Sequence, residues 1–543
     1  MNILGIHGGI TINQHEPSAA LLINGKVIAI CEEERYLRNK SAYGYLPYYA
    51  IKACLDIGQI KPEEIDLVVS PGCTYVNFKD HLANFLRHSF GIKADIELVH
   101  HQVAHIATSF YGSGFNNALC LSLDASGDGS SGFIALADWD KSIKILEEIP
   151  TNNSLGFFYT MMTHYLGYSD GDEYKVMGLA PYGKQKMDLS PIAKPTEKGW
   201  KFDWSFIRSN PSCKSPFEPV YSQKLIDTLG RQNRHPDQPL EDFHRNIAYS
   251  TQDVLEQCFL SLVTHYHRQY PDVKNFCYSG GIALNCVANG KLFDLNIFDQ
   301  IYVSPVSSDR GLALGCAYLG AVKCGDQPRA LEHAYQGREF TNDHIKKELV
   351  SNGINFTEVN DPSKSAAEFI ANGKIIGWFQ GRSECGARAL GNRSILANAS
   401  EKNMKEKVNK KIKYREEFRP FAPSVLLEDS GTYFHNRNIP SPHMCLTFQC
   451  KPQKAQEITS VVHVNQTARI QTVSESDNSR YYSLIKNFKS LTGIPVILNT
   501  SFNLKGQPIV DSPRDALMTF FGCGLDALFL GDFLVEKANG KFA

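Results

Sequence analysis

The chain has 543 residues, with 56 Lys plus Arg against 57 Asp plus Glu, and it is 43% hydrophobic and 21% charged. This composition is typical of a globular protein with two large domains or several domains of ~150 residues. The near-neutral charge argues against a dedicated nucleic-acid or membrane-surface protein. No apolar run approaches the ~18 residues of a membrane span.

The cysteines and the amino terminus indicate a cytoplasmic protein. The 14 cysteines are scattered and form no Cys-x-x-Cys pair, a pattern that is typical of reduced thiols. The first residues, MNILGIHGGI, have no charged region ahead of the apolar stretch. They therefore predict a buried strand and not a signal peptide.

The first part of the chain predicts alternating strands and helices. ILGIH (3–7) has the pattern of a strand, and SAALLINGKVIAICEEER (18–35) that of a hairpin with a Gly turn. YYAIKACLDIG (48–58) predicts an amphipathic helix, and IDLVVSPG (65–72) predicts a strand that ends in a Pro-Gly break. The alternation favours an α/β fold.

Three predicted strands end in small polar loops, near residues 7–15, 124–132 and 279–285. The backbone N–H groups of such loops can bind phosphate, and a following helix adds the positive end of its dipole. None of the three is a P-loop or a G-x-G-x-x-G turn, and a lone Gly-Gly turn is more often structural. Three of them in one α/β region favour the split nucleotide cleft of the actin-like ATPases.

Two stretches interrupt this pattern. Residues 185–245 are polar and irregular, and we expect them to form surface insertions. A second change of composition, at 336–365, precedes a module that begins with a predicted helix and strand. We therefore expect two domains, 1–340 and 341–543, and no internal sequence repeat is clear.

Three histidines lie close together in VHHQVAHIATSFY (99–111), which predicts a helix. His101 and His105 are four residues apart, so they share one helix face and could offer two imidazoles to one metal. By itself the pair carries little weight, because capping and core histidines are more common. His100 points elsewhere on the helix, and we expect it to be a supporting or interfacial residue.

Two aspartates could complete such a metal site. Asp124 ends the strand LSLD, and Asp309 lies in SSDRGLALG (307–315). Both stand where an apolar segment meets a Gly-bearing turn. Two histidines and two carboxylates with open positions suit Fe(II), Mn(II) or Zn(II), and the spacing alone does not choose among them.

Basic residues gather in two segments of the C-terminal module, 377–394 and 411–424. Arg binds phosphate through two parallel hydrogen bonds and Lys acts as a point charge, so Arg388 and Arg419, together with a lysine of these segments, predict an anion site. The alternative is a solvated basic helix face. We accept this alternative for the lysines of the charge run, Lys405, Lys407, Lys410 and Lys411.

A second group of polar residues follows in the same module. Arg469 lies in TARIQTV, and the predicted buried strand in VILNTSFNLKGQPIV (496–510) ends in short polar side chains. Such side chains at a strand end can hold a phosphate or a small amide. They are Asn499, Thr500, Ser501 and Asn503.

The chain resembles the NodU/CmcH family of O-carbamoyltransferases from ILGI (3–6) to GDFLVEK (531–537). The motifs that carry the resemblance occur in the family's order and spacing: HHQVAH, LDASGDG, KVMGLAPYG, SGGIALNCVANG and SSDRGLALGCAY. The resemblance implies an α/β protein with a duplicated, actin-like (ASKHA) N-terminal domain and a YrdC-like C-terminal domain. Both halves are similar to proteins of tRNA threonylcarbamoylation.

The resemblance also assigns residues. Its iron ligands would be His101, His105, Asp124 and Asp309. Its carbamoyl-phosphate and carbamoyladenylate site would be Arg388, Lys413, Arg419, Arg469, Asn499 and Ser501. Its nucleotide site in the N-terminal domain would include Lys175, Gly280, Gly281 and Asn285.

The implied reaction has two steps. Carbamoyl phosphate and ATP, with Mg(II), form carbamoyladenylate, which then carbamoylates a hydroxyl of a small-molecule acceptor. The acceptor would be a natural product or a sugar, as in antibiotic or toxin biosynthesis. Fe(II), or another divalent transition metal, would act as a Lewis acid. His15 is the better candidate for the acceptor base and Lys40 the second, and the alternative role of His15 is to make hydrogen bonds within its loop.

Some positions depart from the family pattern, among them Asn13 and Glu16 in the loop beside the acceptor and Ala387 in GARALG. The main alternative function is a fusion enzyme of the tRNA-threonylcarbamoylation type, which the near-neutral charge and the lack of a basic stripe disfavour. A non-catalytic actin-like scaffold is the third. A homodimer is one option for the assembly, and we expect neither nucleic acid nor membrane as a partner.

Overall fold

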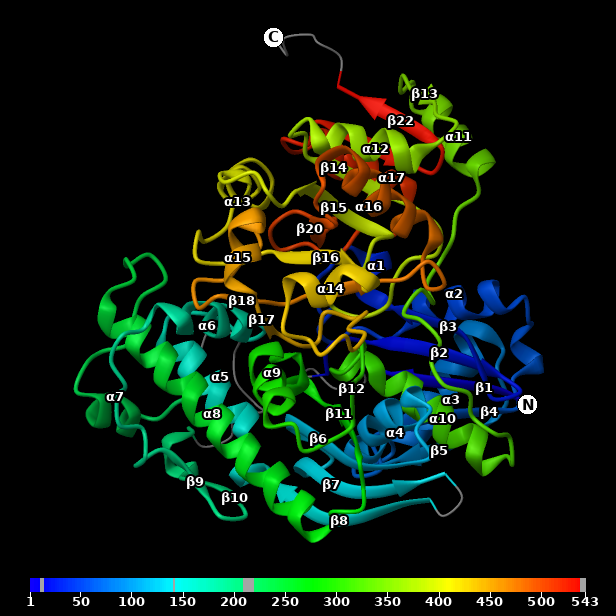
Figure 1. Cartoon of the computed structure of the whole chain (residues 1–543). Coiled ribbons are helices and arrows are strands. Elements are labelled where there is room, and N and C mark those ends of the chain that lie inside the picture. The colour runs from blue at the N-terminus through cyan, green and yellow to red at the C-terminus, as the bar shows by residue number, and fades with distance from the viewer. Residues whose placement is uncertain (10–13, 140–141, 209–218, 538–543) are drawn as a thin grey trace. The chain divides into compact units, whose positions relative to one another are not determined.

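Two five-stranded mixed sheets share one strand order in the first half of the chain (Figure 1). The first sheet runs β3 (Lys26–Glu32), β2 (Ser18–Ile23), β1 (Asn2–His7), β4 (Leu67–Pro71) and β5 (Asp95–Val99). The second runs β8 (Ser142–Pro150), β7 (Ser130–Asp138), β6 (Asn117–Gly127), β11 (Asn275–Ser279) and β12 (Gln300–Val303).

The strand directions of the two sheets also match. β1 pairs antiparallel with β2 and parallel with β4, which pairs parallel with β5. In the same way, β6 pairs antiparallel with β7 and parallel with β11, which pairs parallel with β12. The same topology built twice indicates a duplicated fold, although the sequence showed no clear repeat.

This computed structural model describes residues 1–9, 14–139, 142–208 and 219–537. The chain forms two compact units, which we call the first unit and the second unit. The first unit contains Met1–Ile28 and Tyr43–Leu331, and the second contains Ala29–Ala42 and Glu332–Ala543. Residues 29–42 therefore belong to the second unit, although they precede most of the first unit in sequence.

Glycines allow three elements of the first unit to pack closely. A Cβ on Gly5 of β1 would come 1.9 Å from the carbonyl oxygen of Ala313, which lies in helix α10 (Leu312–Lys323). A Cβ on Gly315 of the same helix would come 1.9 Å from the carbonyl oxygen of Ala104, in helix α4 (His101–Ser113). Since only Gly avoids these overlaps, β1, α10 and α4 can lie in direct backbone contact.

The first unit contains further helices, one of which was predicted from its amphipathic pattern. The predicted amphipathic helix at 48–58 is α2 (Tyr48–Gly58). The others are η1 (Pro62–Glu64), α3 (Phe78–Phe90), η2 (Thr151–Asn153), α5 (Leu155–Tyr165), α6 (Glu173–Leu179), η3 (Ala180–Tyr182), α8 (Asp242–Gln269), η6 (Gly281–Leu284), α9 (Cys286–Leu295) and η7 (Asp309–Gly311). None of the helices in the described residues combines the length and the apolar character that crossing a lipid bilayer requires.

The prediction that residues 185–245 form irregular surface insertions is wrong for part of this stretch. It contains the hairpin β9 (Ala193–Thr196) and β10 (Gly199–Phe202), the turn η4 (Trp204–Phe206) and the helix α7 (Gln223–Leu229). Three aromatic side chains on these elements, Trp200, Phe202 and Phe206, are buried. The high polar content of the stretch led to the wrong prediction, because a few buried aromatic side chains are enough to hold it against the core.

The second unit is built on one mixed sheet of eight strands. Its order is β13 (Thr357–Glu358), β22 (Phe533–Glu536), β21 (Ala527–Leu530), β14 (Ile376–Phe379), β15 (Arg393–Asn398), β20 (Val496–Ser501), β16 (Ala422–Leu426) and β19 (Gln471–Val473). Helices α12 (Pro362–Ala371) and α16 (Ser479–Thr492) pack with these strands in one hydrophobic cluster around Trp378. The mixed α/β class is the one that the sequence predicted.

Shorter elements complete the second unit. The helices are α1 (Glu33–Leu37), α11 (Asn342–Ser351), α13 (Met404–Val408), the π-helical turn η8 (Asn409–Lys413), α14 (Leu427–Tyr433), α15 (Pro452–Ala455), η9 (Gln456–Ile458) and α17 (Pro513–Phe521). The strands β17 (Phe448–Gln449) and β18 (Thr467–Ala468) form a separate pair.

Candidate metal centre and anion site

Helix α4 begins at His100, which caps it. The Nδ1 atom of His100 accepts a hydrogen bond from the backbone N–H of Gln102 at 3.1 Å, and its ring stacks on Phe133 with the centroids 4.6 Å apart. A side-chain acceptor at this position satisfies an N–H group that the helix leaves unpaired. His100 therefore supports the start of the helix, as expected of a residue that points away from the other two histidines.

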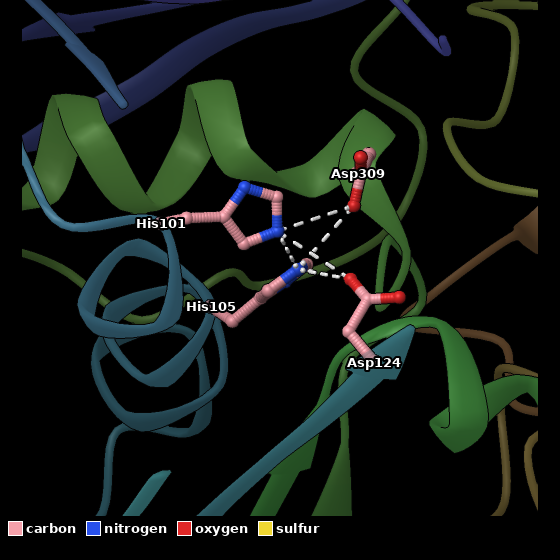
Figure 2. A group of neighbouring side chains, drawn as sticks. All are labelled: His101, His105, Asp124 and Asp309. Carbon is pink, nitrogen blue, oxygen red and sulfur yellow. Dashed lines mark hydrogen bonds and ion pairs between the residues drawn. The ribbon is translucent and has the colours of Figure 1, made fainter. Parts of the chain in front are cut away.

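His101, His105, Asp124 and Asp309 come together in the first unit, with one ligand atom of each within 4.8 Å of the others. Figure 2 shows the two imidazoles and the two carboxylates pointing at one another. Nε2 of His105 lies 3.1 Å from Nε2 of His101 and 3.1 Å from Oδ2 of Asp124. Both imidazole nitrogens lie 3.5 Å from Oδ1 of Asp309.

These distances fit a divalent cation. A first-row divalent ion binds His nitrogen and carboxylate oxygen at about 2.0–2.2 Å, which sets neighbouring ligand atoms about 3.0–3.5 Å apart in octahedral or tetrahedral geometry. The five distances that involve a histidine nitrogen are 3.1 to 3.5 Å, and all the ligand atoms lie within 4.8 Å of one another. The four residues therefore offer a donor set of the right chemistry at the right spacing.

The electrostatics of the cluster also favour positive charge. Burial opposes protonation of His101, but the carboxylates of Asp309 and Asp124 outweigh it and raise its pKa to about 10. Burial likewise opposes ionisation of Asp309, yet the charge and hydrogen bonds of the histidines hold its pKa well below the usual range. Two ionised carboxylates in a buried site require compensating positive charge, which protonated histidine or a bound metal cation can supply.

Two further histidines surround Asp309. Nε2 of His7, at the end of β1, lies 3.7 Å from Oδ2 of Asp309 and 3.1 Å from the carbonyl oxygen of His15. Nε2 of His15 lies 4.0 Å from the same carboxylate oxygen. The sequence pattern singled out His15 as a candidate base but not His7. Its position at the end of a buried strand, just before Gly-Gly, was the available signal.

Glu16 connects this loop to the turn that carries Asp309. Its carboxylate forms an ion pair with the Arg310 guanidinium and also accepts a hydrogen bond from the Arg310 backbone N–H at 3.4 Å. The Arg310 side chain is 9% exposed and that of Glu16 11% exposed. The charge of Arg310 outweighs the effect of burial and lowers the pKa of Glu16 to about 2. Glu16 has φ 56°, a backbone conformation that L-residues rarely adopt. Asn13 lies outside the described residues.

The predicted glycine loop lies against the metal cluster. Gly280 has φ +93°, and a Cβ there would come 2.2 Å from the carbonyl oxygen of Leu123. A Cβ on Gly281 would come 2.9 Å from Oδ1 of Asp124. The loop between β11 and α9 therefore needs both glycines in order to approach the end of β6.

The other two residues of the predicted nucleotide site make contacts within the protein. Asn285 caps α9 by accepting from the Ala288 N–H at 3.1 Å, and it exchanges two hydrogen bonds with Gln252. Nζ of Lys175 lies 2.8 Å from Oδ2 of Asp172 and 5.0 Å from the Tyr168 ring centroid. The structure places Gly280 and Gly281 beside the end of β6 that carries Asp124. Asn285 instead stabilises the start of α9, at the end of the same loop, through its hydrogen bonds.

Lys413 is a buried cation in the second unit. Its ammonium group donates to oxygens of Ser501 and Asn503, including Oδ1 of Asn503 at 2.7 Å. Burial lowers its pKa well below the usual value, and the charges of Arg415 and Arg419 lower it further. Within the described ranges of the chain, no carboxylate forms an ion pair with Lys413. The site therefore holds uncompensated positive charge, which favours an anion.

The predicted partners of Lys413 have different surroundings. Arg388, Arg419 and Arg469 are half-buried. Nη1 of Arg419 lies 3.7 Å from a carboxylate oxygen of Glu416. Asn499 is 1% exposed, and its amide nitrogen donates to the carbonyl oxygen of Ala389 at 3.2 Å, next to Arg388.

The lysines of the basic run are not all alike. Lys410 and Lys411 are exposed, as expected for a solvated helix face. Lys405 is half-buried, and burial together with the charge of Arg415 lowers its pKa. Arg415 and Lys405 were not among the predicted site residues. Lys40, the second candidate base, is exposed and belongs to the residues 29–42 of the second unit.

Comparison with known proteins identifies the family. The family model described as the carbamoyltransferase N-terminus matches residues 72–318, and that of the carbamoyltransferase C-terminus matches residues 367–537. Nodulation protein NolNO of Sinorhizobium fredii is 36% identical over 100% of this chain and 83% of its own length. The chain belongs to the NodU/CmcH family of carbamoyltransferases.

Other relatives of this carbamoyltransferase carry related names. Nodulation protein NolO of Bradyrhizobium diazoefficiens is 37% identical over 81% of this chain and 78% of its own. The 3'-hydroxymethylcephem-O-carbamoyltransferase of Streptomyces clavuligerus is 32% identical over 74% of each chain. The chain is therefore a transferase enzyme. Among solved structures, HypF of T. kodakarensis is 14% identical, with a TM-score of 0.38 over 60% of this chain and 48% of its own.

Proposed function

We propose that this carbamoyltransferase forms carbamoyladenylate from carbamoyl phosphate and ATP, with Mg(II), and transfers the carbamoyl group to a hydroxyl of a small-molecule acceptor. Formation is assigned to the second unit and transfer to the first unit. A relative that is 32% identical is named for carbamoylation at a hydroxymethyl group, which supports a hydroxyl acceptor here. Because the described cysteines are free thiols, a cytoplasmic location is also proposed.

The observation that carries the proposal is the charge around Lys413. A buried ammonium group that only neutral oxygens contact, with Arg415 and Arg419 nearby, is electrostatically incomplete. A phosphate group would supply the missing negative charge, and Arg388 and Arg419 could bind it bidentately. Formation of the adenylate would release phosphate as water cleaves carbamoyl phosphate to carbamate, and pyrophosphate as the carbamate oxygen bonds to the α-phosphorus of ATP. The same cations would stabilise the negative charge that develops on these leaving groups.

The two units suit this division of work. The duplicated topology of the first unit supports an actin-like domain, whose two halves bind a nucleotide between them. Asp124, near the carboxyl end of β6, and Gly280, just after β11, lie at the same edge of the second sheet. Ligands bind at the carboxyl ends of the strands in open α/β folds. For the second unit, we propose a YrdC-like fold on the basis of its mixed eight-stranded sheet and its cationic site.

His101, His105, Asp124 and Asp309 would hold Fe(II) or another divalent transition metal. When bound, such an ion supplies Lewis acidity and positive charge at the site of transfer. Gly280 and Gly281 would leave room for the adenylate beside Asp124. The buried position of His105 and its neighbours would keep water away from an activated carbamate.

The acceptor hydroxyl needs a base. In the transfer, its oxygen forms a bond to the carbamoyl carbon, the bond from that carbon to the phosphate oxygen breaks, and AMP leaves. We assign the proton of the hydroxyl to His15, whose ring is 40% exposed and lies 4.0 Å from Asp309. Glu16, through its ion pair with Arg310, would fix the backbone that carries His15.

A direct test separates the two steps. The purified enzyme should exchange pyrophosphate into ATP in the presence of carbamoyl phosphate and release phosphate, without any acceptor. Adding hydroxyl acceptors one class at a time should then give AMP and a carbamoylated product. If pyrophosphate exchange does not depend on carbamoyl phosphate, the adenylation proposal is wrong.

A further inference from the structure

Residues 29–42 of the second unit hold one residue of the loop that carries Arg388. The Glu32 carboxylate accepts a hydrogen bond from the Gly386 N–H, and Nη2 of Arg35 donates to the Gly386 carbonyl oxygen at 2.8 Å. Glu32 and Arg35 pair with each other, with Nε of Arg35 3.2 Å from Oε2 of Glu32. One ion pair thus binds both the N–H and the carbonyl group of Gly386.

This arrangement is buried and is anchored by further hydrogen bonds. Glu32 and Arg35 are 4% exposed each, and Gly386 has φ +93°, a conformation that favours glycine. The segment itself is anchored further along, because Arg38 donates to the carbonyl oxygens of Ile509 at 2.6 Å and Pro508 at 3.1 Å. Helix α1 is therefore fixed in the second unit at both of its ends.

Other side chains hold the far side of the same loop. Oε1 of Glu384 accepts from the backbone N–H groups of Leu390 at 2.6 Å and Arg393 at 3.2 Å. Nε2 of Gln471 donates to the Leu390 carbonyl oxygen at 2.7 Å, and Asn499 donates to that of Ala389 at 3.2 Å. The backbone is fixed on both sides of Arg388, at Gly386 and at Ala389.

We infer that Glu32 and Arg35 are positioning residues for Arg388. A guanidinium group binds phosphate bidentately only when its backbone is held in the right place, and small displacements of a binding group cost much of its effect. The inference rests on the proposed function, in which Arg388 binds phosphate. It also means that the anion site of the second unit is incomplete without a segment from the beginning of the chain.

Amide hydrogen exchange tests the contact itself on the full-length protein. In Glu32→Gln and Arg35→Lys, peptides covering residues 385–391 should exchange about tenfold faster than in the wild type, since a buried hydrogen bond to a charged group is lost or weakened. Peptides from β20 should be unchanged, which shows that the unit remains folded. Glu63→Gln, at an exposed position of η1, is the control and should leave the loop unchanged.

A double-mutant cycle with Arg388→Ala tests the positioning role. Glu32→Gln should lower pyrophosphate exchange about tenfold in the wild-type background and have no further effect when Arg388 is already absent. Equal losses in both backgrounds would mean a general structural role and would overturn the inference. Unchanged amide exchange of residues 385–391 in both Glu32→Gln and Arg35→Lys would also overturn the inference. If the wild type itself shows no carbamoyl-phosphate-dependent activity, the proposed function fails, and the amide exchange still decides whether Glu32 and Arg35 hold the loop.

Discussion

Nε2 of His101 and Nε2 of His105 face each other at 3.1 Å on one side of helix α4 (Figure 2). At this distance the two nitrogens can share a proton, or both can bind one cation when the rings are neutral. The carboxylates of Asp124 and Asp309 approach the same pair of atoms at 3.1 to 3.5 Å. The relationship of the two histidines therefore supports the proposed cation and leads to the first prediction.

His101→Ala or His105→Ala should abolish metal binding and carbamoyl transfer, because each removes one ligand. The pyrophosphate exchange that we assign to the second unit should remain. Metal content can be measured by elemental analysis after dialysis against a weak chelator. His100→Asn is a matched control on the same helix, since Asn can still cap α4, and it should keep the metal. Wild-type metal content in both alanine variants would refute the ligand assignment.

Arg388→Lys and Arg419→Lys should each lower the rate of pyrophosphate exchange by ~10²–10³, on the order of 2–4 kcal/mol of transition-state stabilisation. Lys keeps the charge but loses the two parallel hydrogen bonds. Lys410→Ala, at an exposed position near the same site, is the control and should be close to neutral. A similar loss in all three variants would show a general electrostatic effect instead of a specific site.

Lys413 should make the stability of the second unit depend on pH. Its pKa is lower in the folded protein than in the unfolded chain, where it is near the usual value of about 10.4. Between these two values the unfolded chain binds more protons, so the free energy of unfolding rises with pH as the buried ammonium loses its charge. Below the folded pKa the full cost of burying the charge remains.

The comparison that isolates this effect uses Lys413→Met, which removes the titrating group. Going from pH 7 to pH 10, wild-type stability should rise relative to the variant, as measured by amide exchange of β20 in both proteins at each pH. Carbamoyl phosphate should reduce the difference, because a bound anion favours the charged lysine. Parallel pH profiles for the two proteins would show that the pKa of Lys413 does not change on folding.

The ion pair of Glu16 and Arg310 should control metal affinity through the turn that carries Asp309. Glu16→Gln should weaken metal binding by roughly 10–100-fold, the usual cost of losing a residue that orients a ligand. Competition with a chelator measures this affinity without any need for activity. Arg310→Gln should have a similar effect, and the double variant should lose little more than either single variant.

Glu97→Gln is the control for this prediction, because it removes the carboxylate of a surface ion pair with Lys323 in the same unit. Surface pairs contribute little, so its metal affinity should equal that of the wild type. Additive losses in the double variant at positions 16 and 310 would mean that the two residues act separately.

Short-range patterns predicted several elements and one pair of site residues. Short apolar segments predicted strands that became β1 and β4, and the helical period placed α2 at 48–58. The spacing of His101 and His105 put their imidazoles on one face of α4, because residues four apart lie one turn apart. The arginines proposed to bind an anion could be named from their residue type and their Gly, Pro or aromatic neighbours. These features depend only on neighbours along the chain, so the order of the amino acids is enough to predict them.

Which side chains from distant segments lie close together depends on how the strands and helices pack. Asp124 and Asp309 could be named as candidates, but their approach to the histidines depends on the order of the strands and on the glycines that let α10 pack against α4. The same holds for His7 and for the pair of Glu16 and Arg310.

The C-terminal site shows this limit most clearly. The strand pattern at 18–35 predicted β3 but could not show that Glu32 and Arg35 belong to the second unit and bind Gly386. Lys405 lies in a run of charged residues that predicted a solvated helix face. In the structure it is half-buried, and the charge of Arg415 contributes to its lowered pKa. The period of a helix or strand depends on local backbone geometry, whereas its neighbours depend on how apolar faces far apart in the chain pack together. The amino-acid order therefore specifies which functional groups the chain carries, whereas tertiary packing specifies which of these groups lie close enough to act together.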